Sequence, residues 1–205
     1  MEPFDLARAG ALVLAGYLIG GIPWGVIVAR LSGGPDPRTI GSGRTGGANV
    51  ARAIGPRLAL VSGLLDMLKG TAAVLLVRFV GAGVEVEVLA GLAAIVGHSR
   101  SPFLGLSGGR GVAPGFGAGL VFSPFAAVIT MAVFGGVLAA WRYTSLASLV
   151  GSAAGGVVLA IQVVATGMPT ALLGFAIGAP VLIWLFHLDN IGRLLRGEER
   201  KFGAR

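Results

Sequence analysis

Long apolar segments separated by short polar connections dominate the 205-residue chain. Seven are long enough for helices, and they cover residues 6–30, 58–80, 85–97, 111–122, 124–141, 144–166 and 169–187. About 20 apolar residues cross the hydrocarbon core of a bilayer, so the pattern predicts an all-α, polytopic membrane protein with one domain over residues 1–205. The third and fourth segments are short, and we expect them to tilt, to thin the bilayer locally or to re-enter it.

The composition excludes an ordinary soluble domain. The chain is 55% hydrophobic and only 12% charged, far from the average of globular proteins. Its 36 glycines suit close helix approach in lipid, and the absence of cysteine excludes disulfide and thiolate chemistry. The N-terminal segment lacks the basic start of a secretory signal, so we expect it to be retained as a helix.

Basic connections alternate with neutral or acidic ones along the chain. The basic ones are residues 30–57, residues 97–111, Arg142 and the tail after His187. By the positive-inside rule, this pattern predicts an external N-terminus and a cytoplasmic C-terminus. All connections with polar motifs then face the cytoplasm. The net charge of +7 is confined to these short connections, so nucleic acid is not an expected partner.

The connection GHSRSPFLGLSGGRG, residues 97–111, has the composition of an anion-binding loop. Gly108, Gly109 and Gly111 lack a Cβ, so successive backbone N–H groups can curl around an anion. Arg110 adds a planar cation, and a helix expected from Val112 would offer its N-terminus. The alternative interpretation is a flexible surface turn with one arginine that reaches out of the membrane.

The first basic connection carries a second glycine-rich motif, GSGRTGGANVAR, at residues 41–52. It matches the spacing GxGxxG, but Pro35 and Pro37 precede it in place of a strand, which argues against a dinucleotide site. Its hydroxyls, Asn49 and Arg52 still suit an anion, with a helix expected from Gly46. An ordinary basic surface loop is the alternative.

Four of the ionisable residues within or next to apolar segments are candidates for chemistry. Asp66 and Lys69 are three residues apart on one helical face, and we expect a structural ion pair. His98 and His187 end apolar segments, where each could take a proton, bind phosphate or interact with the helix dipole. Neither histidine has an aspartate five residues later, and no metal-binding or triad motif is present, so no metal or cofactor is expected.

Taken together, three motifs resemble those of the bacterial acyl-phosphate:glycerol-3-phosphate acyltransferases, small polytopic enzymes that begin phospholipid synthesis. The resemblance covers almost the entire chain and extends to Asp66, Lys69 and residues 142–148. The motifs are Gly41-Ser42-Gly43 with Gly46, Asn49 and Arg52; Gly97-His98 with Pro102-Phe103 and residues 108–113; and Asn190-Ile191 with Arg193-Leu194, Gly197 and Glu199.

The resemblance implies transfer of a fatty acyl group from acyl phosphate to the 1-hydroxyl of glycerol 3-phosphate, giving lysophosphatidic acid and phosphate. The location it implies is the cytoplasmic face of the bacterial inner membrane, with membrane lipids as further partners and a monomer as a compatible state. A mixed anhydride is already activated, so the main tasks are positioning and charge screening. No protein nucleophile is required, and the mechanism proposed for the family lets the donor phosphate accept the hydroxyl proton.

The matched positions imply a role for each site residue. We expect Ser42, Asn49 and Arg52 to contact phosphate and glycerol, Arg110 to neutralise phosphate, and His187 with Asn190 to orient glycerol phosphate. Glu199 is expected to tie the tail to a basic loop. The catalytic set is Ser42, Arg52, Arg110, His187 and Asn190; the substrate-binding set is Gly41, Gly43, Asn49, His98, Gly108, Gly109 and Gly111; the supporting set is Asp66, Lys69, Arg193 and Glu199.

The chain departs from the family pattern at several positions. Arg110 stands where lysine is usual, Ser107 replaces a second lysine, and Arg44 replaces asparagine. Ser101 replaces an aromatic residue, and Pro114 replaces threonine. Arginine and lysine bind phosphate with different geometry, so these changes affect donor, acceptor or rate more than reaction class. We hypothesise that Arg44 supplies the charge that Ser107 lacks.

Two other functions fit the same sequence. A transporter or flippase of a phosphorylated metabolite or lipid would also need basic residues near its spans, but alternating access requires polar groups at mid-membrane, where only Asp66 and Lys69 qualify. The substitutions also suit a non-catalytic lipid-binding paralogue.

Overall fold

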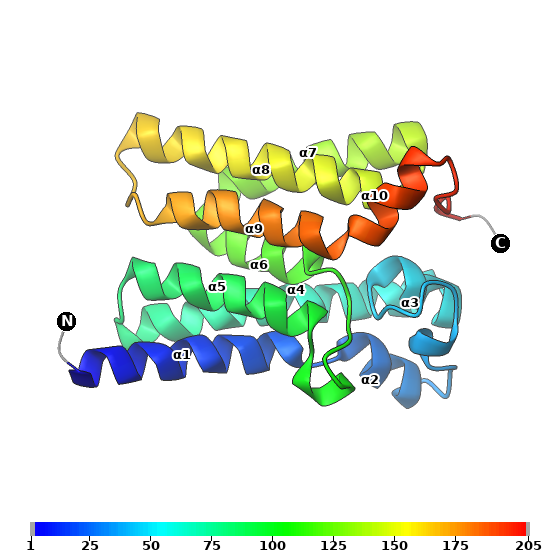
Figure 1. The fold of residues 1–205 in the computed structure, drawn as a ribbon, viewed down its shortest axis with the longest axis horizontal. Helices are drawn as coiled ribbons and strands as arrows, with labels where there is room; N and C mark the ends of the chain where they lie inside the picture. The colour runs from blue at the N-terminus through cyan, green and yellow to red at the C-terminus, as the bar shows by residue number, and fades with distance from the viewer. Residues whose placement is uncertain (1–2, 204–205) are drawn as a thin grey trace.

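The computed structural model describes residues 3–203, and its regular elements are all helical, with one isolated bridge between Ser101 and Ser107. The predicted all-α class is confirmed (Figure 1). The helices are α1 (Pro3–Gly21), α2 (Trp24–Leu31), η1 (Pro37–Thr39), α3 (Gly47–Ile54), α4 (Pro56–Val80), α5 (Val84–Ser99), η2 (Pro102–Leu104), α6 (Val112–Phe122), α7 (Pro124–Trp141), α8 (Thr144–Thr166), α9 (Leu172–Phe186) and α10 (Leu188–Leu195).

Each of the seven predicted segments forms a helix, but the first segment is interrupted and the last has different bounds from those predicted. The first is interrupted at Ile22 and Pro23, because proline supplies no N–H and the Ile22 carbonyl accepts a hydrogen bond from Lys69 Nζ at 2.8 Å. The last begins only at Leu172, and it ends at a bend of 65° into α10, which the apolar pattern did not predict.

Within residues 3–203, four helical stretches are long and apolar enough to cross a membrane. They are Asp5–Leu31, Pro56–Val80, Pro124–Trp141 and Thr144–Thr166, and the bent pair α9–α10 provides a fifth if it forms one span. α5 and α6 have 16 and 11 residues, in agreement with the two short segments expected.

Glycine allows the helices to approach closely, as expected in lipid. A Cβ on Gly97 would overlap the Tyr17 carbonyl where α5 packs on α1, and one on Gly70 would overlap the Pro114 backbone where α4 packs on α6. The bundle is filled around an edge-on pair, Phe122 and Phe175, whose ring centroids are 4.9 Å apart. At these two crossings the helices therefore pack backbone against backbone, without side chains between them.

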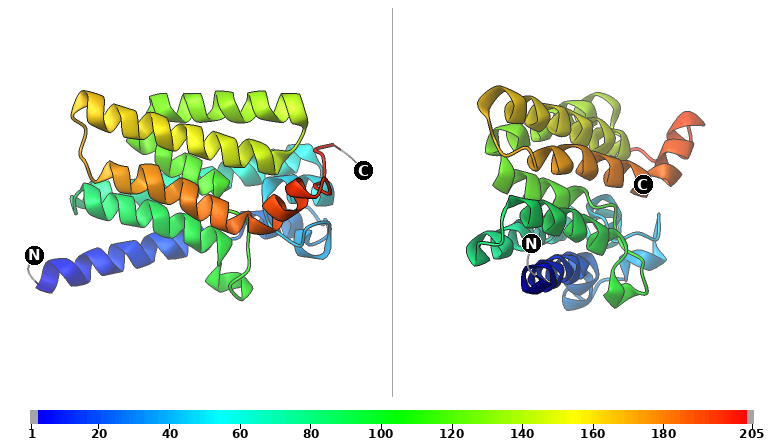
Figure 2. Two further views of the ribbon diagram at one scale, coloured as in Figure 1. Left: turned by 45° about the horizontal axis from the view of Figure 1, so that its top comes forward. Right: turned by 60° about the vertical axis from the view of Figure 1, so that its left-hand side comes forward.

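All connections with polar motifs gather at one end of the bundle. The turn before α3, the connection between α5 and α6, the α7–α8 corner and the tail all lie at the end that carries the C-terminus (Figure 1). Figure 2 shows α1 inclined on the outside of the bundle, with α7 and α8 on the opposite side. The expected gathering of these motifs at one side of the helices is confirmed.

Replacement of Gly97 by valine should separate α1 from α5, because the new side chain meets the Tyr17 carbonyl. We expect the free energy of unfolding to fall by about 1–3 kcal/mol, the usual cost of overpacking. Thermal unfolding in detergent measures this change. Gly136→Val is the control, since α7 leaves open space around Gly136; equal melting temperatures for the two variants would contradict the close-packing argument.

Candidate active site

A cavity of about 800 Å³ begins at the polar end and continues between the apolar helices. Most predicted site residues line it, although they come from segments far apart in the sequence. Those at the cavity are Gly41, Ser42, Asn49, Arg52, Asp66, His98, Arg110, His187, Asn190, Arg193 and Glu199. Gly43, Lys69, Gly108, Gly109 and Gly111 lie outside the lining.

Asn49 organises the first glycine-rich loop. Its side-chain amide nitrogen donates to the carbonyls of Pro37 at 2.6 Å, Ile40 at 3.0 Å and Arg44 at 2.8 Å, and its oxygen accepts from Ser42 N–H at 3.1 Å. An amide has only two N–H groups, so both are committed to the backbone. The buried Asn49 side chain thus shapes the loop around Ser42, whereas we had expected it to contact the substrate.

The second glycine-rich loop folds over His98 and departs from the predicted nest. The Gly109 N–H donates to the His98 carbonyl at 3.0 Å, so it is not available to an anion. A Cβ on Gly108 would overlap that same carbonyl, and one on Gly109 would overlap the His98 ring. These glycines are needed for close backbone approach. The expectation that α6 begins directly after the loop is confirmed, with Gly111 as N-cap at φ +79°.

A buried polar cluster lies beneath this second loop. Asp66 Oδ1 is 2.8 Å from Lys69 Nζ and 3.5 Å from His98 Nδ1, and all three residues are buried. The predicted ion pair is confirmed. Because Lys69 also donates to the Ile22 carbonyl, the cluster connects the α1–α2 break, α4 and α5.

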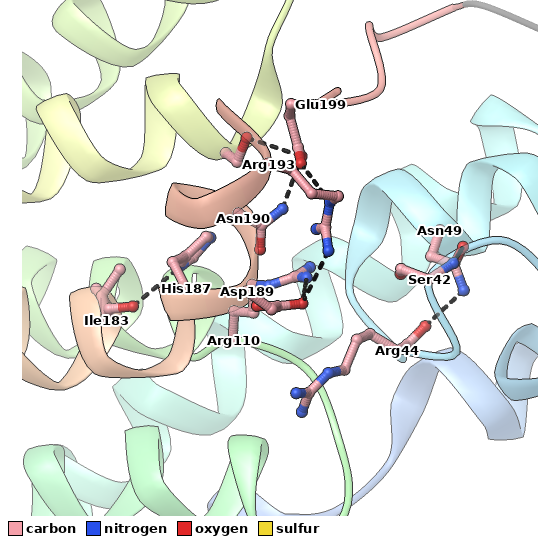
Figure 3. A network of polar contacts seen from close by, with 11 residues as sticks. Ser42, Arg44, Asn49, Arg110, Ile183, His187, Asp189, Asn190, Arg193 and Glu199 are labelled. Atoms are coloured by element: carbon pink, nitrogen blue, oxygen red, sulfur yellow. Dashed lines mark hydrogen bonds and ion pairs between the residues drawn. The ribbon is translucent and has the colours of Figure 1, made fainter. Parts of the chain in front are cut away.

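Glu199 anchors the C-terminal tail to two helices. One carboxylate oxygen accepts from Ser145 Oγ at 3.0 Å and Asn190 Nδ2 at 2.7 Å, and the other accepts from Arg193 Nε at 2.7 Å (Figure 3). Glu199 was expected to tie the tail to a basic loop, but its partners lie on α8 and α10. Ser145 was not among the predicted site residues.

Arg110 reaches from the second loop to α10. Its Nη2 is 2.9 Å from Asp189 Oδ2, and Arg193 Nη1 is 3.5 Å from the same oxygen. Burial raises the pKa of Asp189, but Arg110 and Arg193 outweigh this effect and hold it below the ordinary value. Arg110 Nε is buried without a hydrogen-bond partner among residues 3–203, so it has a donor available for an anion.

His187 and Asn190 place two hydrogen-bond acceptors in the cavity wall. His187 Nδ1 is 2.8 Å from the Ile183 carbonyl, which can only accept, so Nδ1 carries the proton and Nε2 of the neutral ring is an acceptor. Asn190 Oδ1 is buried with no partner within the described part of the chain. These two atoms suit substrate hydroxyl groups.

The mouth of the cavity is cationic. Five arginines line it, against Glu199 and the adjacent Asp189, and they are Arg44, Arg52, Arg110, Arg193 and Arg200. The pKa of Arg52 lies below its ordinary value, mainly because of burial and then because of the nearby Arg200, although Glu199 acts in the opposite direction. Arg44 points toward the side of the site that holds Arg110 (Figure 3), but Ser107 lies outside the lining and donates to the Leu104 carbonyl.

Sequence analysis missed Asp189 and Arg200 as site residues. The four-residue spacing from Asp189 to Arg193 is a helical pair that could have drawn attention to Asp189. Arg200 follows the tethered Glu199 in an irregular tail, and no local pattern marks it.

The inner part of the cavity is apolar and open at the side. Leu60 and Leu64 of α4 and Met131 of α7 line it, although they are 64%, 47% and 50% exposed. An apolar opening on the long side of a membrane bundle faces lipid chains. The cavity therefore joins a cationic mouth to an apolar surface on the side of the bundle.

Glu199→Ala should release the tail, because the buried carboxylate loses three hydrogen-bond partners at once. We expect hydrogen–deuterium exchange of residues 198–201 to become at least tenfold faster, which corresponds to about 1.4 kcal/mol. The matched control is Glu198→Ala, since the Glu198 side chain is 58% exposed and its carboxylate bonds only to Arg196 in the described structure. The same exchange rate in both variants would refute the anchoring role.

Comparisons with known proteins agree with this geometry. Residues 10–197 match the family model described as glycerol-3-phosphate acyltransferase. A glycerol-3-phosphate acyltransferase of Rubrobacter xylanophilus is 43% identical over 95% of each chain, and one of Anaeromyxobacter sp. strain Fw109-5 is 43% identical over 96% of this chain and 98% of the relative. The crystal structure of PlsY (YgiH), an integral membrane glycerol 3-phosphate acyltransferase in its glycerol 3-phosphate form, superposes with a TM-score of 0.86 at 36% identity and 96% coverage of both chains. The chain belongs to the glycerol-3-phosphate acyltransferase family.

Proposed function

We propose that the protein transfers a fatty acyl group from acyl phosphate to the 1-hydroxyl of glycerol 3-phosphate and releases lysophosphatidic acid and phosphate. The observation that carries this proposal is the junction of a cationic mouth with an apolar groove that opens toward lipid. Both substrates carry phosphate, and only the donor and the product carry an acyl chain. The similar solved protein has a glycerol 3-phosphate form and a lysophosphatidic acid form, which supports the same pair of ligands here.

Polar atoms without a hydrogen-bond partner in the described structure support a binding site for glycerol 3-phosphate, the acyl acceptor, next to α10. Asn190 Oδ1 and His187 Nε2 accept hydrogen bonds from the glycerol hydroxyls, and Arg110 Nε donates to a phosphate oxygen. Arg52 and Arg200 also line the cavity and add positive charge at its mouth. We therefore keep His187, Asn190, Arg110 and Arg52 in direct substrate contact.

Acyl phosphate suits this site as donor because its carbonyl carbon is already activated. The 1-hydroxyl oxygen attacks this carbon, the new ester C–O bond forms, the carbonyl carbon–phosphate oxygen bond breaks, and phosphate leaves with the bonding pair. The hydroxyl proton passes to the departing phosphate. The arginines keep two anionic substrates close together, so the main contributions of the protein are positioning and electrostatic stabilisation.

Other predicted residues act through the shape of the site. Asn49 holds the loop that presents Ser42 and Gly41, and we propose that Ser42 donates a hydrogen bond to phosphate. His98 supports the glycine loop from below. Asp66 and Lys69 fix the floor of the cavity, and the Glu199 tether holds Arg193 and Asn190 in place.

We further propose that all seven apolar segments lie in the bacterial inner membrane, as a monomeric unit with the N-terminus outside and the active site facing the cytoplasm. The basic connections at one end of the bundle support this orientation. Because the chain has no cysteine, single introduced cysteines labelled from either side of the membrane test the orientation directly.

The purified protein in lipid nanodiscs, given palmitoyl phosphate and glycerol 3-phosphate, should form lysophosphatidic acid and phosphate in equal amounts. Phosphate release and mass spectrometry of the lipid measure the two products. Palmitoyl-CoA with the same acceptor serves as the comparison and should give much less product. Absence of product, together with uptake of glycerol 3-phosphate into sealed proteoliposomes, would favour a transporter and exclude our proposal.

Arg44→Ala should weaken phosphate binding in this reaction, because it removes a guanidinium from the cavity lining near Arg110. We expect kcat/KM to fall about tenfold or more, in line with the loss of one charge-assisted hydrogen bond. Arg30→Ala is the matched control at the same end of the bundle, since Arg30 lines a separate pocket beside α2. Equal kcat/KM values for Arg44→Ala and the wild type would show that Arg44 does not replace the missing charge of Ser107.

A further inference from the structure

The groove that leaves the cationic mouth follows one face of α8. Six lining residues recur at alternating spacings of three and one, as one helical face requires, and they are Ser148, Gly151, Ser152, Gly155, Gly156 and Leu159. On α9 the lining runs from His187 back to Phe175, a difference of twelve residues or about 18 Å. The groove is therefore long and narrow, and it runs along the helices.

The length of the groove matches an acyl chain of a membrane lipid. From Ser148 to Leu159 the axis of α8 advances by eleven residues, or about 16 Å. One leaflet contributes about 15 Å to the hydrocarbon core, half of its total thickness. An extended acyl chain whose carbonyl lies at the mouth would reach the far end of the groove.

The far end of the groove is closed by core side chains. Leu159, Phe175 and Ala126 line the cavity and are also 3%, 5% and 5% exposed members of the hydrophobic core. Phe175 is held against the Phe122 ring, which belongs to the same core. Just above this floor, α8 touches α7 at Gly155 and α9 at Gly156, where an added Cβ would overlap Thr130 and the Ala176 backbone.

One glycine leaves room beside the floor. Gly119 of α6 lines the groove, and a Cβ built there would make only an ordinary contact, 3.6 Å from the Phe175 ring. The helix packing therefore tolerates a Cβ at Gly119, and a longer side chain there would extend from the lining of the groove. Gly136 of α7 also has open space around it, but it lies outside the lining.

We propose that Leu159 and Phe175, together with the space at Gly119, set the longest acyl chain that the groove accepts from the donor. The proposal rests on the acyl transfer proposed above. The occupant is the saturated chain of an acyl phosphate, because the groove is apolar, closed at one end and joined to the phosphate-binding mouth at the other. Residues at the floor therefore determine specificity without touching the reacting atoms.

The experiment compares lauroyl, palmitoyl and stearoyl phosphate as donors at saturating glycerol 3-phosphate, with the protein in nanodiscs. Gly119→Leu should lower kcat/KM for palmitoyl and stearoyl phosphate about tenfold or more relative to lauroyl phosphate, since one methylene group in a hydrophobic pocket discriminates about tenfold or more. Leu159→Ala should change the ratio in the opposite direction and raise the relative rate of the stearoyl donor. Gly136→Leu, the matched control, should keep the wild-type ratios.

The outcomes separate this proposal from the function on which it rests. A wild-type protein that uses no acyl phosphate overturns both. A wild-type protein that is active, with unchanged donor ratios in folded Gly119→Leu and Leu159→Ala variants, overturns only the role of the floor. The role of the floor is also overturned if Gly119→Leu lowers kcat/KM equally for all three donors and Leu159→Ala leaves the donor ratios unchanged. Such a loss would reflect general damage to the fold, which does not depend on chain length.

Discussion

The ion pair between Asp66 and Lys69 holds together the parts of the chain that build the floor of the site. It lies within α4, yet Lys69 also donates to the Ile22 carbonyl at the α1–α2 break, and Asp66 faces His98 beneath the second glycine loop. Charges this deep in a bundle are costly to desolvate, so they persist only when each has a partner. The same pairing therefore fixes the position of Arg110, which follows the loop that rests on His98.

At the mouth of the cavity, unlike at the buried ion pair, positive charges are not matched by an equal number of negative ones. Arginines outnumber carboxylates there, and the two carboxylates are already engaged by Arg110 and Arg193. Such an excess of like charge is unfavourable in the empty protein and is relieved when anions bind. The two phosphate-bearing substrates that we propose would supply this neutralisation, so the repulsion between arginines in the empty site would favour substrate binding.

The sequence predicted the helices well because each apolar segment must satisfy its own backbone in lipid, and helix formation does this locally. Ser123 and Pro124 even marked the α6–α7 boundary, where the Ser123 hydroxyl caps α7. The break after Ile22 and the bend before α10 could not be read in the same way. The bend follows from tertiary packing, and the break combines a local signal, Pro23, with a partner distant in sequence, Lys69, for the carbonyl of Ile22.

The same distinction applies to the candidate site. Arginine, histidine and glycine motifs indicated which segments would meet, because their chemistry is visible residue by residue. The partners of each side chain were not visible: Asn49 uses its amide on the backbone of its own loop, and the Gly109 N–H bonds to His98. Asp189 and Arg200 enter the site through the bend and the tether of the tail, which are consequences of tertiary packing.

A single helix connects the two halves of the site. α8 carries Ser145, which bonds to the Glu199 tether at the cationic mouth, and fourteen residues later it carries Leu159 at the closed end of the groove. An α-helix does not change its length appreciably, so the distance along α8 from Ser145 at the tether to Leu159 at the floor is fixed at about 21 Å. The cationic end therefore cannot move outward to accommodate a longer chain. A donor whose acyl chain is longer than the groove must move its carbonyl away from the arginines. The reacting carbon is then out of position, and the rate of transfer falls with chain length.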